Sequence, residues 1–325
     1  IVAFCKDIEE DGFQKLVNWC IEMMQDFDFK VAVGYGWNHE VNIKNQMTEI
    51  NEMIARDKKE KIAGSSEFDI NDKIIQDVKA LLEENKFLVY LQPKVNIRTG
   101  ETIGAEALIR LKDKEKGIVS PIHFINLFEK YNIVQEIDLY VLDEVCKFQK
   151  NMLEQGKNPL PISVNFSKKT LEYEKLINHV GTILDKYELP NGLVQIEITE
   201  TVGDMDHMLI RDVANSLRTM GFVLDMDDFG TKYSNISMLV QFQFGVAKID
   251  RSLIKDITEN EKSVIVLRHL TDMISELGIE CIIEGAETEE QIDIIKTMNC
   301  DVVQGFYYGK PVDINDFYRM FVDKS

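Results

Sequence analysis

Features that would point to thiolate-metal, membrane or nucleic-acid chemistry are scarce in this 325-residue sequence. No CxxC pair occurs, and most of the five cysteines lie in apolar segments, where a reduced thiol behaves as a small hydrophobe. This pattern argues against disulfides and against a zinc site. The cysteines are Cys5, Cys20, Cys146, Cys281 and Cys300. The five histidines lack ligand spacing and are predicted to lie at the surface. They are His39, His123, His179, His207 and His269.

Long apolar runs and an excess of positive charge are also absent. No stretch reaches the roughly 18 apolar residues of a membrane span, and the first residues show no basic segment followed by a cleavage site. We therefore expect a cytoplasmic chain, or the cytoplasmic part of a longer protein, without membrane contact. The net charge of -19 argues against binding duplex nucleic acid through its phosphates. An anionic substrate would need bound cations to bridge it to this protein.

Two regions of different rhythm divide the chain. Residues 1–64 alternate strand and helix patterns but show only two strands, which are too few for an independent sheet. We interpret them as the second half of an α/β domain. Residues 65–86 are predicted to form a polar linker and a first helix, and residues 87–325 a large domain.

Eight strand candidates follow in the large domain, most of them separated by helical stretches. They are Phe87 to Val95, Thr102 to Arg110, Pro161 to Ser167, Val194 to Glu200, Val223 to Phe229, Val246 to Asp250, Glu280 to Glu284 and Asp301 to Tyr307. The turn at 98–101 leaves no room for a crossover helix, so the first two strands should be antiparallel. The remaining alternation predicts an α/β fold, a (β/α)8 barrel with an irregular first strand.

Oxygen ligands gather at the predicted carboxyl ends of these strands, where barrels do chemistry. They are Glu106, Asn165, Glu197, Asp227 and Asp228. A site without His or Cys selects hard cations such as Mg²⁺ or Mn²⁺ over zinc. Two such ions could clamp both the attacking water and the leaving oxygen of a phosphodiester.

Two further polar residues interrupt apolar strands. Lys248 could orient or acidify a nucleophilic water, and Glu284 could act as a general base, a metal ligand or both. Each residue also has a structural interpretation, since Lys248 could be a snorkelling surface lysine and Asp227-Asp228 a simple turn. The repetition of the pattern on five successive strands favours the functional interpretation.

The motif series resembles the EAL family of cyclic di-GMP phosphodiesterases, which is named after the tripeptide found here as Glu106-Ala107-Leu108. The resemblance extends over about 240 residues. Its other segments are Tyr90 to Val95, Ser163 to Ser167, Glu197 to Glu200, Asp227 to Thr231, Lys248 to Arg251, Glu284 to Thr288 and Gln304 to Phe306. The family implies a (β/α)8-type barrel with an antiparallel first strand and hydrolysis of cyclic di-GMP to linear pGpG with Mg²⁺ or Mn²⁺. A homodimer formed through the barrel is a further expectation from relatives.

The same resemblance assigns roles. The metal ligands would be Glu106, Asn165, Glu197 and Asp227, with Asp228 on a second ion. Lys248 and Glu284 would handle the attacking water. Arg110 and Gln92 would bind the substrate, and the supporting residues would be Glu200, Asp250, Glu287 and Gln304.

Two regions depart from the family pattern. Lys232 stands where relatives usually carry glycine in the loop after Asp228, so it loses glycine's access to positive φ. A receptor that binds cyclic di-GMP without turnover is therefore the alternative to an enzyme. Residues 1–64 resemble, less specifically, the second half of a GGDEF domain without its signature, which predicts a degenerate fragment with no cyclase activity.

Overall fold

The computed structural model describes residues 76, 78, 80–82, 84, 86–113, 116–199, 206–231 and 236–323. The predicted GGDEF-like fragment at 1–64 lies outside these residues, and so do Glu200 and Lys232. The predicted domain limits at 64 and 86 therefore stay predictions.

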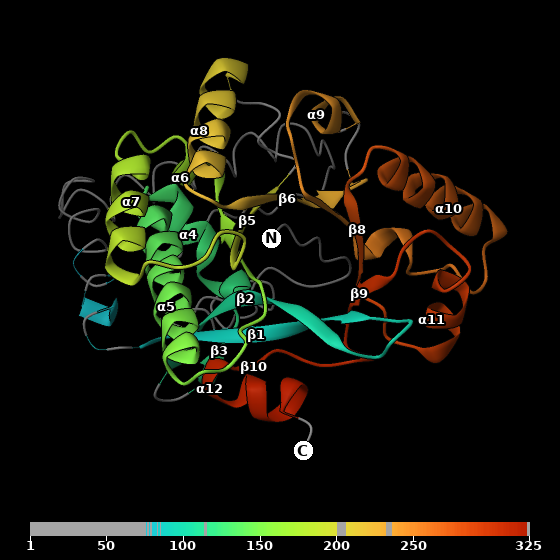
Figure 1. Cartoon of the computed structure of the whole chain (residues 1–325), viewed down its shortest axis with the longest axis horizontal. Coiled ribbons are helices and arrows are strands. Elements are labelled where there is room, and N and C mark those ends of the chain that lie inside the picture. Colours follow the sequence, from blue (N-terminus) through green and yellow to red (C-terminus); the bar gives the residue numbers. More distant parts are fainter. Residues whose placement is uncertain are drawn as a thin grey trace, which may run out of the picture. The chain divides into compact units, whose positions relative to one another are not determined.

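A closed ring of eight strands forms the centre of the described chain (Figure 1). The ring follows the order β1-β9-β8-β7-β6-β5-β4-β2, and pairing of β2 with β1 closes it. Its members are β1 (Phe87–Asn96), β2 (Thr102–Asp113), β4 (Ile162–Phe166), β5 (Val194–Thr199), β6 (Val223–Phe229), β7 (Val246–Ile249), β8 (Glu280–Glu284) and β9 (Val302–Gln304). Strand β1 is antiparallel to β2 and β9, whereas the neighbours from β2 round to β9 are parallel. We call the end of the barrel where the parallel strands finish the carboxyl rim.

Helices lie outside this ring (Figure 1). They are α4 (Ile125–Lys130), α5 (Val134–Glu154), α6 (Lys168–Leu171), α7 (Leu176–Tyr187), α8 (His207–Thr219), α9 (Ile236–Gln241), α10 (Glu261–Glu276), α11 (Glu289–Ile295) and α12 (Ile314–Phe317). Two short 3-10 helices, η1 (Pro121–His123) and η3 (Arg251–Leu253), and a π-helix, η4 (Tyr318–Val322), complete the described set. Side-chain caps fix several starts: Ser167 accepts the amide of Thr170 at α6, and Thr288 forms a capping box with Gln291 at α11. No described helix is long and apolar enough to cross a bilayer.

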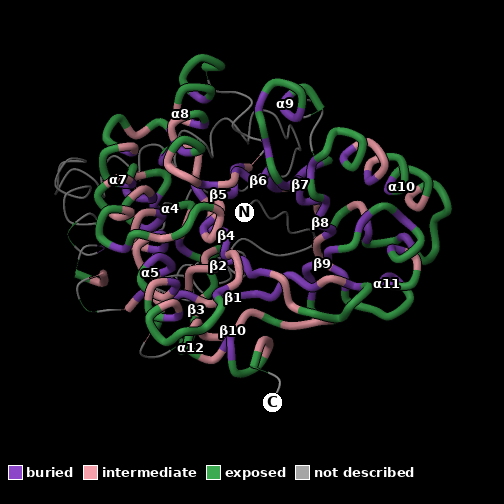
Figure 2. Tube along the Cα trace, in the orientation of Figure 1, coloured by how far each residue is buried: buried purple, intermediate pink, exposed green. Residues whose placement is uncertain are grey.

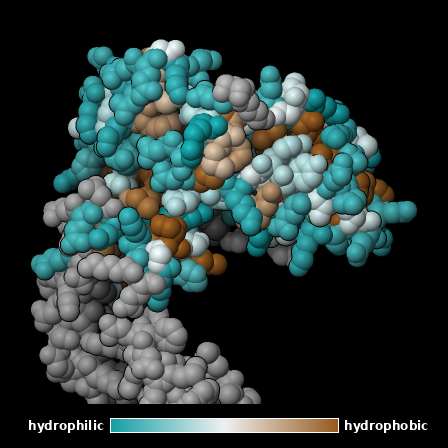
Figure 3. Space-filling model, turned by 90° about the horizontal axis from the view of Figure 1, so that it is seen from below, coloured by the Kyte–Doolittle hydropathy of each residue, from teal (hydrophilic) through white to brown (hydrophobic). Residues whose placement is uncertain are grey.

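Burial follows from this arrangement. Figure 2 shows the strands of the ring mainly as buried segments and the outer helices with exposed faces. One large apolar cluster joins strands to covering helices, whereas Val246, Ile282 and Val302 form a smaller cluster of their own. Lys248, Glu284 and Gln304 lie two residues further along the same strands, and therefore on the same face. This face changes from apolar to polar toward the carboxyl rim. The described residues on the face shown in Figure 3 are mainly hydrophilic, with apolar side chains in smaller groups.

The existence of the eight predicted strands is confirmed, and so is the antiparallel first strand, but the last strand ends at Gln304 and not at Tyr307. Two short edge strands were not predicted, β3 (Gly117–Val119) on β2 and β10 (Val312–Asp313) on β1. The placement of Glu106 at the end of its strand was wrong, because β2 continues to Asp113. The parallel ladder with β4 ends at Ala107, and β2 goes on beyond it paired to β1 and β3. Glu106 thus lies near the end of the segment that β2 shares with β4.

Candidate active site

Lys248 lies at the centre of the site, with only 1% of its surface exposed. Its Nζ is surrounded by four carboxylates from four strands. They are Glu284 at 2.7 Å, Glu197 at 2.8 Å, Asp227 at 3.0 Å and Glu106 at 3.4 Å. We call these five residues the Lys248 cluster. The burial excludes a snorkelling surface lysine, and the four contacts bring together the residues that sequence analysis selected on separate strands.

Amide side chains hold Glu106 in place. Asn165 Nδ2 on β4 donates to Glu106 Oε1 at 2.8 Å. Gln304 Nε2 on β9 donates to Glu106 Oε2 at 2.5 Å and to Gln92 Oε1 at 3.2 Å. Both carboxylate oxygens of Glu106 therefore have a neutral donor, and Gln92 is linked to the site through Gln304.

A second buried lysine lies one layer deeper. Lys94 of β1 is 3% exposed, and its Nζ donates to Ser163 Oγ at 2.7 Å and to Glu197 Oε1 at 3.1 Å. Asp225 Oδ2 lies 3.6 Å from the same Nζ. We call Lys94, Ser163, Glu197 and Asp225 the Lys94 cluster. Glu197 belongs to both clusters, because its other oxygen, Oε2, accepts from Lys248.

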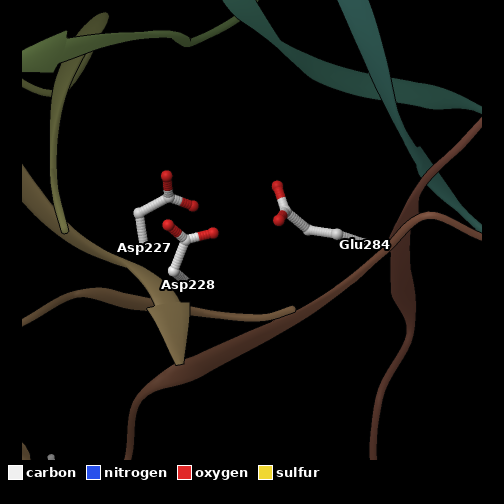
Figure 4. A group of neighbouring side chains, drawn as sticks. All are labelled: Asp227, Asp228 and Glu284. Atoms are coloured by element: carbon white, nitrogen blue, oxygen red, sulfur yellow. The ribbon is translucent and has the colours of Figure 1, made fainter. Parts of the chain in front are cut away.

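Three carboxylates at the carboxyl rim point toward one another. Asp227 and Asp228 come from the end of β6 and Glu284 from β8 (Figure 4), and one oxygen of each lies within 4.8 Å of the others. Asp228 has φ +56°, a left-handed conformation that is uncommon for a residue other than glycine, and the β6–β7 register shifts between Met226 and Phe229. This local irregularity lets two consecutive carboxylates face the same side.

The donor set fits hard divalent cations. Among the described residues, the two clusters and the rim contain six carboxylates, and Lys94 and Lys248 form ion pairs with five of them. The six carboxylates are Glu106, Glu197, Asp225, Asp227, Asp228 and Glu284. Buried negative charge in such excess needs cations or protons to balance it, and an all-oxygen set prefers Mg²⁺ or Mn²⁺.

The pKa values of these carboxyls diverge with their surroundings. Burial raises the pKa of Glu284 to about 8 and that of Asp225 to about 7, against the partial opposition of the nearby lysines. Burial also raises the pKa of Glu106 and Asp227. Burial acts in the same sense on Glu197, but the charges of Lys248 and Lys94 outweigh it and lower that pKa to about 2. Glu197 is thus held ionised between its two lysines, while Glu284 binds a proton more readily than an ordinary glutamate.

A cavity of about 340 Å³ opens beside the Lys248 cluster. Its lining includes the predicted residues Gln92, Asp250, Glu287 and Gln304, and also Leu108, Arg251 and Phe306. Asp250 caps η3 by accepting the amide of Ser252 at 2.9 Å, and the amide of Glu287 donates to Gln291 Oε1 at 2.8 Å.

Arg110 is placed differently from the other predicted substrate residues. It lies four residues beyond Glu106 on β2, where its guanidinium covers the ring of Tyr90 at 5.7 Å and donates to the carbonyl of Ile109 at 2.8 Å. It is not among the residues that line the cavity. Its role in substrate binding stays a prediction.

Sequence reasoning predicted Glu197 but assigned no role to Lys94, Ser163 and Asp225, the other members of the Lys94 cluster. A charged residue inside an apolar strand was a usable signal, because Lys94 lies two residues after Gln92 and Asp225 two before Asp227, on the same strand faces. The predicted surface position of the histidines is confirmed for those in the described part of the chain. Its four histidines are exposed, and Cys146, Cys281 and Cys300 are buried free thiols.

An acidic site at the carboxyl rim of a closed eight-stranded barrel defines the structural class of the chain. The EAL domain family matches residues 75–311, so this chain belongs to that family. The cyclic di-GMP phosphodiesterase RocR of Pseudomonas aeruginosa is 30% identical over 249 residues, which are 75% of this chain and 62% of that protein. Signaling protein YkoW of Bacillus subtilis is 30% identical, over 76% of this chain and 31% of its own length.

A solved structure shows the same fold. The PaMucR phosphodiesterase in a c-di-GMP complex superimposes with a TM-score of 0.70 at 28% identity, covering 75% of this chain and 99% of that one. The chain spans 62% or less of the length of the curated relatives named above.

Proposed function

We propose that this chain hydrolyses cyclic di-GMP to linear pGpG with the help of Mg²⁺ or Mn²⁺. The main support is the Lys248 cluster, where four strands bring Glu106, Glu197, Asp227 and Glu284 to one ammonium. Membership of the EAL family and the activity named for RocR support the same reaction. A homodimer and a cytoplasmic location stay predictions.

The carboxylates and the amide oxygen of Asn165 are the groups that would hold the cations. One ion would take Glu106, Asn165, Glu197 and Asp227, and a second would involve Asp228 and Glu284, which lie close to Asp227. Bound there, divalent cations neutralise the phosphodiester and lower the pKa of water.

Glu284 and Lys248 are the residues of this chain that we assign to the attacking water. The water oxygen forms a bond to phosphorus, and the bond from phosphorus to the 3′ oxygen breaks. That oxygen leaves as a hydroxyl after taking a proton from solvent water. Glu284 in its ionised form accepts a proton from the water. The Lys248 ammonium, whose Nζ lies 2.7 Å from Glu284 Oε1, holds the Glu284 carboxylate in place.

The cavity supplies the substrate contacts in this proposal. Gln92 and Gln304 present amide groups beside Glu106, while Asp250 and Glu287 line the opening. Asp250 and Glu287 also support the backbone next to the catalytic strands through their contacts to Ser252 and Gln291. Arg110 would reach the substrate from beyond the cavity lining.

The test is incubation of the purified chain with cyclic di-GMP and Mn²⁺, followed by chromatography for pGpG. We expect Glu106→Ala to lower the rate by roughly 10²-fold or more, because the side chain is both a proposed ligand and a partner of Lys248. The exposed Glu101→Ala, in the turn before β2, is the matched control. If cyclic di-GMP binds to the unmodified chain and survives intact, the receptor alternative replaces the enzyme, and Lys232 becomes the first residue to revert to glycine.

A further inference from the structure

Glu197 is held by a different lysine at each oxygen. Lys248 Nζ donates to Oε2 at 2.8 Å, on the side of the carboxyl rim, and Lys94 Nζ donates to Oε1 at 3.1 Å from the deeper layer. The side chain of Glu197 has no exposed surface. Its carboxylate therefore presents one oxygen to the Lys248 cluster and turns the other away from it.

The two lysines differ in how readily they can give up Glu197. Lys248 also contacts Glu106, Asp227 and Glu284, so a cation that binds these carboxylates competes with it directly. Lys94 is held in the deeper layer by two further contacts. Its Nζ donates to Ser163 Oγ at 2.7 Å and lies 3.6 Å from Asp225 Oδ2.

Asp225 helps to keep Lys94 in this position. Its carboxylate is fully buried, accepts no hydrogen bond within the described residues, and has Lys94 as its one ion-pair partner there. Moving Lys94 away would leave the buried Asp225 carboxyl without a partner, which costs free energy whether the group stays ionised or takes up a proton. Lys94 should therefore stay on Glu197 Oε1 when a cation replaces Lys248 at Oε2.

A carboxylate restricted to one oxygen discriminates between cations. Mg²⁺ keeps a compact octahedral shell with single carboxylate oxygens at roughly 2.0–2.1 Å, whereas Ca²⁺ takes about 6–8 oxygens and often both of one carboxylate. Mn²⁺ shares the preference for all-oxygen sites of this kind.

We propose that Lys94 is a specificity-determining positioning residue, which restricts Glu197 to one ligand oxygen and so favours Mg²⁺ and Mn²⁺ over Ca²⁺. This inference rests on the cation site of the proposed function. Lys94 itself touches neither substrate nor cation.

Calorimetric titration of the full chain with Mn²⁺ and with Ca²⁺, without nucleotide, tests the proposal. The informative variant is the double substitution Lys94→Met with Asp225→Val, because it removes a lysine and a carboxylate together and keeps the charge of the site. We expect the affinity ratio of Ca²⁺ to Mn²⁺ to rise on the order of tenfold in the double variant. The single variant Asp225→Val is the matched control: it retains Lys94 on Glu197, so both affinities should fall together with the ratio unchanged.

An unchanged ratio in the folded double variant overturns the inference while leaving the proposed function intact. Failure of the unmodified chain to bind Mn²⁺ overturns both. A crystal structure of the unmodified chain with Mn²⁺ decides the matter if the double variant does not fold. Glu197 should then bind through Oε2 with Lys94 still on Oε1, and an ion held by both oxygens would contradict the proposal.

Discussion

Lys94 and Lys248 are both buried in the barrel among carboxylates, but they differ in whether a cation can displace them. Lys248 is surrounded by four carboxylates at the carboxyl rim, beside the cavity. Lys94 is a layer deeper, with Ser163, Glu197 and Asp225 around it, and does not line the cavity. The Lys248 cluster holds four carboxylates and one lysine, and a cation bound at the rim can balance the excess negative charge in place of that lysine. Lys94 instead lies between two buried carboxylates, Glu197 and Asp225, away from the cavity. Similar residues thus give an exchangeable layer above a fixed one.

Substitution of Lys248 should have the largest effect. We expect Lys248→Met to lower the rate of cyclic di-GMP hydrolysis about 10³-fold, because the residue that holds Glu284 and the attacking water is lost. This corresponds to about 4 kcal/mol in the activation free energy. Initial rates of pGpG formation at saturating Mn²⁺ measure it, with the exposed Lys262→Met as control.

Substitution of Lys94 should affect the stability of the fold, and the effect of Mn²⁺ on stability should differ between the variants of Lys94 and Lys248. Lys94→Met leaves Asp225 buried without its lysine, so the free energy of unfolding should fall by about 3 kcal/mol. Urea unfolding measures this change with and without Mn²⁺. Because Mn²⁺ that binds the folded rim stabilises each protein, the informative quantity is the deficit of a variant relative to the unmodified chain at the same Mn²⁺ concentration. Mn²⁺ should close the deficit of Lys248→Met, whose carboxylates it can reach, and should leave that of Lys94→Met. Equal recovery of both variants would erase the distinction between an exchangeable and a fixed layer.

Asp138 of α5 shows what a buried carboxyl does when its hydrogen-bond donors are neutral. It accepts from Thr170 Oγ1 at 2.6 Å and from the amide of Ser167 at 2.8 Å, and burial raises its pKa to about 6. A folded-state pKa above the unfolded value of about 3.8 contributes stability below that value, and the contribution is lost as pH rises through 6.

Between pH 4 and pH 7 the free energy of unfolding of the unmodified chain should therefore fall by about 2 kcal/mol relative to that of Asp138→Asn. The amide oxygen of the asparagine in this variant can accept the same hydrogen bonds. Urea unfolding of both proteins at pH 4.5, about 6 and 7.5 gives the difference. Asp185 on α7 is exposed, so the free energy of unfolding of Asp185→Asn should depend on pH in the same way as that of the unmodified chain. A constant difference between Asp138→Asn and the unmodified chain would show that this carboxyl does not titrate in the window.

The smallest expected change in stability comes from breaking a solvent-exposed ion pair. Lys157 and Asp323 lie 2.9 Å apart with 39% and 50% of their side chains exposed. Lys157→Met should change the free energy of unfolding by less than about 1 kcal/mol, since solvent screens the pair. Urea unfolding at low and high salt measures this change. A decrease in the free energy of unfolding as large as that of Lys94→Met would show that burial does not explain the difference between the two ion pairs.

Sequence patterns were sufficient for the barrel because each strand has its own apolar run. The eight strands and the antiparallel start were predictable from these runs and from the short turn at 98–101. The edge strands β3 and β10 were not, since they have three and two residues and their pairing depends on neighbours far along the chain. The true end of β2 depends likewise on β3.

The site was predictable where polar residues end strands. Glu284 ends β8, Asp227 and Lys248 lie within two residues of the ends of β6 and β7, and the structure brings all three together. Lys94 and Asp225 were not found, because each is followed by further strand residues and their importance lies in a contact across the barrel. Burial of Lys248 could not be read from its strand alone, since it depends on carboxylates from four other strands.

The reversed direction of β1 has a consequence for protein engineering. Along β1 the chain descends from Gln92, beside Glu106, to Lys94 in the deeper layer, whereas along β6 it rises from Asp225 to Asp227. Grafting this two-layer site onto an all-parallel barrel therefore requires the order of the two β1 side chains to be inverted. A copy that preserved the spelling Gln-Pro-Lys would place the ammonium at the mouth and the amide in the interior.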